Sequence, residues 1–73
     1  MHRFFVKENA IEGKVVRVTG SDFNHICHSL RLQVGDQFIV NRGDGIDHLV
    51  EIEEVLAETI IAIIKSSKRN NNR

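Results

Sequence analysis

The chain has 73 residues, enough for one domain, and its ten basic and ten acidic residues leave no net charge at pH 7. This balance excludes the strongly basic composition of a simple nucleic-acid binder. The single cysteine excludes an internal disulfide and fits a reducing, cytoplasmic location. The longest apolar run, residues 60–64, is too short to cross a bilayer, and we expect no secretion signal.

The charges are unevenly distributed along the chain. Residues 1–43 carry six basic and four acidic groups, and residues 44–64 carry six acidic groups with no Lys or Arg. Residues 65–73 carry four basic groups and no acidic one. An acidic hairpin therefore offsets a basic front and a basic end, which favours a polyanionic partner. The alternative is a solvated surface on which the charges are segregated by chance.

The first part of the chain predicts two short strands. Residues 3–6 form an apolar run after a basic start, and residues 14–18 are rich in β-branched side chains. Between them, residues 8–13 are polar and end in glycine, which predicts a loop.

An amphipathic helix is predicted next. Thr19 or Ser21 can cap its start, because a hydroxyl can accept a hydrogen bond from an unpaired N–H of the first turn. The apolar side chains then recur with helical spacing, so one stripe faces the core. This stripe consists of Phe23, Ile26, Cys27 and Leu30.

The remainder predicts strands separated by turns. A turn at Gly35-Asp36 leads to a strand over residues 37–42, and a glycine-rich turn at residues 43–45 leads to a strand over residues 47–55. The Glu53-Glu54 pair breaks the alternation and predicts a bulge or a strand end. Residues 59–64 predict a buried strand, whereas residues 65–73 read as a polar linker or tail. We therefore expect a mainly β fold, a small, partly closed β-barrel of five to six strands with one α-helix.

Arg31 is the leading candidate for a functional residue. It follows the predicted helix, where its guanidinium could bind a phosphate or a base edge through two hydrogen bonds. The alternative is that it bonds the last carbonyl groups of the helix. A second group of cations lies on or near the strands and could complete a basic face; the alternative is that these cations protect strand edges. This group consists of Arg3, Lys14, Arg17 and Arg42.

His25 and His28 lie three residues apart on one side of the helix, away from the apolar stripe. They could contact RNA, although exposed polar residues are the simpler interpretation. A metal site would need further ligands from His2 or His48 on distant segments, so we expect no metal. Cys27 lies on the apolar stripe, which argues against a nucleophile. We find no catalytic constellation, and stacking of bases could use only the four phenylalanines, which the core needs first.

Several motifs in their order and spacing resemble the N-terminal PUA-like domain of the ribosomal RNA small-subunit methyltransferase E family. They are Met1-His2-Arg3-Phe4-Phe5-Val6, Thr19-Gly20, His25, Leu30-Arg31-Leu32 and Val34-Gly35-Asp36. The resemblance covers residues 1–64, which it implies are a PUA-like RNA-binding domain. One departure is Asn24, where the family often has a second histidine beside His25.

The resemblance implies a function for a longer protein. Members of this family methylate N3 of a uridine in bacterial 16S ribosomal RNA with S-adenosylmethionine, as a step of ribosome biogenesis. Their second, SPOUT methyltransferase domain binds the cofactor and forms a homodimer, and we expect that domain to be absent from this chain. We accordingly expect a non-catalytic domain without a cofactor, which contacts RNA through Arg3, Lys14, Arg17, His25, Arg31 and Arg42. The alternative is a structural module that orients a catalytic domain with little RNA contact.

Overall fold

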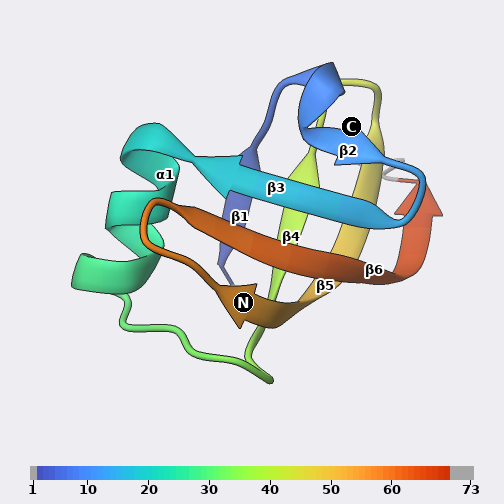
Figure 1. The fold of residues 1–73 in the computed structure, drawn as a ribbon. Helices are drawn as coiled ribbons and strands as arrows, with labels where there is room; N and C mark the ends of the chain where they lie inside the picture. The colour runs from blue at the N-terminus through green and yellow to red at the C-terminus, as the bar shows by residue number, and fades with distance from the viewer. Residues whose placement is uncertain (1, 70–73) are drawn as a thin grey trace.

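The structure, a computed structural model, describes residues 2–69 and contains one six-stranded sheet. The strands lie in the order β1-β4-β5-β6-β3-β2, and the sheet curls into a half-barrel with the helical segment at one end (Figure 1). The mainly β fold with a single helical segment is therefore confirmed. The strands are β1 (Arg3–Phe5), β2 (Ile11–Glu12), β3 (Val15–Thr19), β4 (Gln37–Asn41), β5 (Ile46–Val55) and β6 (Thr59–Arg69).

The sheet is antiparallel except for β1, which pairs in parallel with β4. The chain crosses from β3 to β4 through the helical segment, which packs against β3 and β6. The short β2 and a 3-10 turn, η1 (Glu8–Ala10), occupy the segment that the sequence predicted as a loop. A single apolar residue suffices here, because Ile11 lies opposite Val16 and packs on the core, whereas its neighbour Glu12 is exposed.

The core fills the inner face of the curled sheet. Alternate residues along each strand point inward, and burial of each such side chain contributes about 1.5–3 kcal/mol. The buried cluster consists of Phe4, Val16, Val18, Phe23, Ile26, Phe38, Val40, Val50, Ile52, Ile60 and Ala62.

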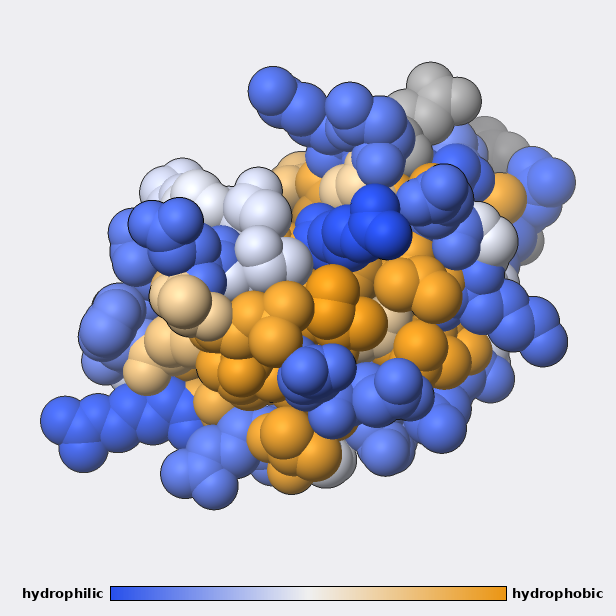
Figure 2. All heavy atoms as spheres, in the orientation of Figure 1, coloured by the Kyte–Doolittle hydropathy of each residue, from blue (hydrophilic) through white to orange (hydrophobic). Residues whose placement is uncertain are grey.

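The outer face is also partly apolar. Val15, Ile61 and Ile63 are half-buried on the outer side of β3 and β6, and Figure 2 shows apolar surface over these strands.

Strand β6 is longer than the sequence predicted. It continues through residues 65–69, which we expected to be a polar linker or tail. The ten-residue β5 provides a partner for this stretch: Leu49 lies opposite Ser66 and Ile46 opposite Arg69. The Oγ of Ser67 also lies 2.7 Å from Nδ1 of His48 on β5. The polar residues 66–69 therefore continue β6, because β5 is long enough to pair with them. Residues 70–73 of the predicted tail lie outside the described residues, and the domain boundary stays a prediction.

Two irregularities bend the β5–β6 hairpin. The register shifts between Ile52 and Glu54, so Glu53 is an extra residue, as the Glu53-Glu54 pair predicted. A second shift between Leu49 and Val50 leaves Lys65 unpaired on the other strand. Bulges increase local twist, which suits a sheet that curls around a core.

The helical segment consists of α1 (Gly20–Asn24) followed by a π-type turn, η2 (His25–Ser29). Thr19 occupies the N-cap position as predicted, but its side chain makes no capping hydrogen bond. It is also the last residue of β3 and lies opposite Thr59, so the strand fixes its backbone. No helix among residues 2–69 is long and apolar enough to span a membrane.

Candidate nucleic-acid interface

The helical segment ends at Arg31 in an unusual backbone conformation. Arg31 has a φ of 55°, in the left-handed region that a residue just beyond a helix often adopts. The N–H of Leu32 donates to the carbonyl of Ile26 at 3.0 Å, a span widened by the π-type turn. Glycine is the usual residue here, because a Cβ in this conformation costs about 1–2 kcal/mol. Arginine therefore occupies this position against the local preference of the backbone.

The guanidinium of Arg31 is exposed beside an open hollow of about 720 Å³. The remaining lining residues are Cys27, His28, Leu32, Gln33, Val34 and Val55. Within the part of the chain that the structure describes, no hydrogen bond or ion pair holds the side chain of Arg31. The alternative, a bond to the last helical carbonyls, is not found.

Three other predicted cations are held by carboxylates of the same domain. Arg3 donates to Asp47 at 2.9 Å, Arg17 to Glu12 at 3.2 Å and Arg42 to Asp44 at 3.1 Å. The Arg17–Glu12 pair is largely exposed and contributes little to stability. In the Arg3–Asp47 pair the carboxylate is only 16% exposed, so water screens it less. The basic front of the chain is therefore partly neutralised within the domain.

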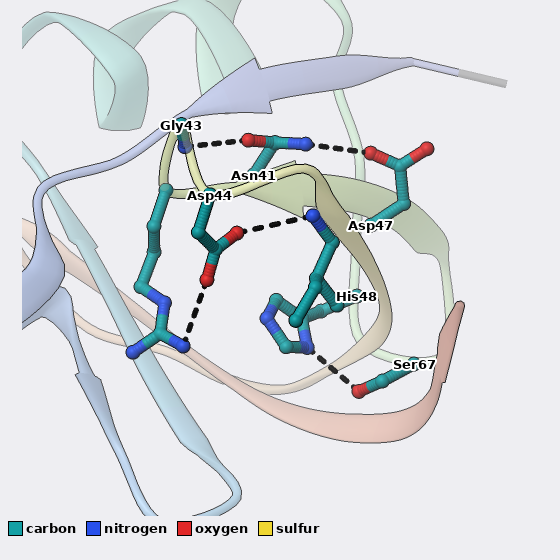
Figure 3. Close-up of polar contacts among 8 residues, drawn as sticks. Asn41, Gly43, Asp44, Asp47, His48 and Ser67 are labelled. Atoms are coloured by element: carbon teal, nitrogen blue, oxygen red, sulfur yellow. Dashed lines mark hydrogen bonds and ion pairs between the residues drawn. The ribbon is translucent and has the colours of Figure 1, made fainter. Parts of the chain in front are cut away.

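A polar network organises the turn between β4 and β5 (Figure 3). Asn41 is buried; its Oδ1 accepts from the N–H of Gly43, and its Nδ2 donates to Asp47 at 2.8 Å. Asp44 accepts from the N–H of Ile46 at 3.1 Å. This hydrogen bond is the main reason that the pKa of the Asp44 carboxyl is lowered; desolvation opposes the shift, and the nearby Arg42 adds to it. The network therefore uses Arg42 and Arg3 to hold a turn.

The histidines divide into structural and surface positions. His48 is buried on the inner face, where its Nδ1 lies 2.7 Å from the Oγ of Ser67. The ring of His25 meets the ring of Phe4 edge-on at 5.8 Å and 71°, so this exposed residue also packs on the domain. His28 lines the same hollow as Arg31, so of His25 and His28 it is the one that lies beside the leading candidate residue. Among residues 2–69, no three His, Cys, Asp or Glu side chains are arranged to hold a metal ion.

Three basic residues of β6 were missed as candidates because residues 65–73 read as a tail. Lys65, Lys68 and Arg69 are exposed on an ordered strand. Lys14 lies next to the start of this stretch, since its carbonyl accepts from the N–H of Ile64 at 2.8 Å. None of the four makes an ion pair with another described residue. We call these four residues the β6 basic cluster. The excess of basic groups after residue 64 was the sequence signal for its three members on β6.

The six predicted site residues lie in separate parts of the fold. His25 and Arg31 lie at the helical segment. Arg3 and Arg42 lie on or next to the β1–β4 pair, whereas Lys14 and Arg17 lie at β3. In the sheet, β4, β5 and β6 separate β1 from β3. The structure thus does not bring all six together, and their contact with RNA stays a prediction.

The curled sheet and the single helical segment define a small β-barrel-like module. Residues 18–65 match the sequence family described as the RNA methyltransferase PUA domain, and this match covers more than half of the chain. The chain belongs to that family. A comparison with curated proteins found no match.

Solved structures have the same fold. A putative methyltransferase from Legionella pneumophila, in complex with its cofactor S-adenosylmethionine, matches 94% of this chain with a TM-score of 0.81 and 22% identity. The ribosomal RNA small subunit methyltransferase E from Neisseria gonorrhoeae, bound to S-adenosylmethionine, matches 99% with a TM-score of 0.79 and 22% identity. A predicted RNA methyltransferase from Thermotoga maritima matches 100% with a TM-score of 0.79 and 18% identity. The matched parts cover 28%, 30% and 32% of those chains, so this chain spans about a third of their length.

Proposed function

We propose that this domain holds ribosomal RNA so that a methyltransferase domain of a longer protein can modify it. The observation that carries this proposal is Arg31, which lies beside an open hollow and whose guanidinium has no partner among residues 2–69. The family of the chain, that of RNA methyltransferase PUA domains, identifies RNA as the anion that we expect there. The proposed substrate is a uridine in 16S ribosomal RNA, methylated at N3 in the cytoplasm of a bacterium.

The binding step would rest mainly on phosphate contacts. Arg31 would bind the RNA backbone at the helix end. The β6 basic cluster would add positive charge, because none of its members forms an ion pair among the described residues, although Asp47 lies opposite Lys68 in the β5–β6 pair. Arg17 would also be accessible, because its pair with Glu12 is solvated. Such contacts position an RNA and carry little sequence information, whereas folded RNA is recognised largely by shape.

The other predicted contacts take secondary roles in this proposal. Arg3 would contact RNA only if its guanidinium also bound, or left, the carboxylate of Asp47. The same condition applies to Arg42 and Asp44. His25 would contribute a polar edge while its ring stays packed on Phe4. A net domain charge of zero then implies weak binding by the domain alone. Linkage to a second RNA-binding domain, and to a homodimer partner through that domain, would raise the overall affinity.

We assign S-adenosylmethionine, which supplies the activated methyl group, to the remainder of such a longer protein. The role that we propose for this domain is RNA binding, with catalysis assigned to the remainder of the longer protein.

The proposal is tested by measuring the affinity of the chain for a 16S ribosomal RNA fragment at low salt. Arg31→Glu should weaken binding by about tenfold or more, since a hydrogen bond to a charged group contributes about 1.5–3 kcal/mol. Arg42→Glu is the matched control, because Asp44 already neutralises that arginine, and its effect should be smaller. Equal affinities of the wild type and Arg31→Glu, with both proteins folded, would refute the proposal.

A second candidate function is a module that orients a catalytic domain with little RNA contact. The pairing of Arg3, Arg17 and Arg42 with carboxylates favours it, because it removes charge that RNA would use. In this case the wild-type chain would not bind the RNA fragment even at low salt.

A further inference from the structure

Phe5 is the aromatic side chain that the core does not use. The other three phenylalanines are at most 8% exposed, whereas Phe5 is 71% exposed. Its neighbour Phe4 points inward and meets Phe38 edge-on at 5.5 Å. Strand alternation therefore directs Phe5 to the outside, where a smaller polar residue would cost less.

Phe5 borders an open hollow of about 500 Å³ where the half-barrel fails to close. One wall comes from the end of β1 and the segment that follows it, and the other from the end of β3 and the start of α1. Figure 1 shows β1 passing behind β3 in this region. Its lining residues include Phe5, Lys7, Arg17 and Asp22.

Both walls carry strand edges without a ladder partner. β1 is the end strand of the sheet and pairs only with β4. On the opposite wall, β2 pairs with Val15 and Val16 but not with residues 17–19, so that edge of β3 is uncovered. Unpaired backbone N–H and C=O groups can form hydrogen bonds with a ligand edge-on. The hollow thus combines an aromatic face with donors and acceptors.

The charges at this hollow suit a nucleotide better than an apolar ligand. Lys7 and Arg17 line it, and the pair between Arg17 and Glu12 is exposed enough to exchange for a phosphate. Asp22 is the opposing acidic group, half-buried at the same hollow. A carboxylate there repels phosphate but can accept a hydrogen bond from an N–H of a base, such as an exocyclic amino group or the N3–H of uracil.

We propose that this hollow binds a single unpaired nucleobase of the RNA, which stacks on Phe5 while Lys7 and Arg17 hold the adjoining phosphates. This inference rests on the proposed function and adds to it a preference for unpaired nucleotides. Unstacked bases in loops and bulges are commonly recognised by aromatic side chains, because every base has a face available for stacking. A base within a duplex is already stacked and cannot enter.

The test compares two RNA probes on the 73-residue chain. One probe is a short oligouridylate carrying a single 2-aminopurine, and the other is the same strand annealed to its complement. Phe5→Leu keeps an apolar side chain but removes the aromatic face, and it should lower the affinity for the single strand about 5- to 150-fold. The affinity for the duplex should not change. Phe5→Trp should retain single-strand binding and the quenching of 2-aminopurine fluorescence.

Leu56→Ala is the matched control, because Leu56 is another exposed apolar residue, 45% exposed, and does not line this hollow. It should leave both affinities unchanged. If Phe5→Leu binds the single strand as tightly as the wild type, while Arg31→Glu still loses affinity for the 16S fragment, the stacking site is refuted and the proposed function stands. Equal losses for the strand and the duplex also refute stacking. If the wild type binds no RNA at low salt, the proposed function fails, and the stacking site fails with it.

Discussion

The end of the helical segment and the turn between β4 and β5 each present an arginine that the sequence nominates for RNA binding. Arg42 at the turn lies against Asp44, and the neighbouring Asn41 and Asp47 form hydrogen bonds that also engage Arg3. Arg31 at the helix end makes no such bond among the described residues and occupies a backbone conformation that favours glycine. The comparison shows that the partner of a cation, rather than its presence, distinguishes a structural arginine from one available to a ligand.

The largest expected effect is the loss of stability when the turn network is broken. Asn41→Ala removes the acceptor of the Gly43 N–H and the donor to Asp47. Because a polar group left without a partner in a poorly hydrated site is costly, the free energy of unfolding should fall by about 2 kcal/mol. Urea denaturation measures this value, and a loss below about 0.5 kcal/mol would mean that the network does not hold the turn.

The helix end should respond in the opposite direction. Arg31→Gly removes the Cβ that disfavours the left-handed conformation, so the free energy of unfolding should rise by about 1 kcal/mol. Arg31→Ala keeps the Cβ and is the matched control, with no such gain expected. Both variants should lose RNA affinity alike, since neither has a guanidinium. If the glycine variant is no more stable than the alanine variant, the backbone is not strained at this residue.

Freeing the arginine of the turn should make it resemble Arg31. In Asp44→Asn the amide oxygen can still accept from the Ile46 N–H, but the charge that neutralises Arg42 is lost. The affinity for the 16S fragment at low salt should therefore rise a few-fold. Salt should suppress the gain, because exposed charges are screened. An unchanged affinity at low salt would indicate that Arg42 lies away from the RNA.

The smallest effect is a pH dependence at the same turn. The folded state lowers the pKa of Asp44 through the Ile46 N–H and, to a lesser extent, Arg42. A lowered pKa means that Asp44 stabilises the fold above its ordinary pKa and that this contribution is lost as pH falls below about 4. The stability difference between the wild type and Asp44→Asn should therefore be constant from pH 5 to 7 and shrink at lower pH. A difference that grows on acidification would contradict this assignment.

The sequence was sufficient for the fold and insufficient for the site, for identifiable reasons. β-branched alternation, the Gly35-Asp36 turn and the Glu53-Glu54 break reflect local preferences, and each corresponds to a feature of the structure. The predicted end of β6 was wrong because residues 65–69 form a strand through their pairing with β5. Their own composition does not indicate this pairing. The partners of Arg3 and Arg17, and the exposure of Phe5, depend on how distant strands meet.

The central claim is most directly tested by RNA affinity measured across a salt series. The 73-residue chain, Arg31→Gly and Arg42→Gln would each be titrated against the same 16S ribosomal RNA fragment. For the wild type, the logarithm of the affinity should fall steeply with the logarithm of salt concentration, and Arg31→Gly should reduce this slope by about 0.7 to 0.9, as for one lost phosphate contact. Arg42→Gln should reduce it less. A slope that is the same for the wild type and Arg31→Gly, or binding that does not depend on salt, would contradict an RNA-binding site centred on Arg31 at the end of the helical segment.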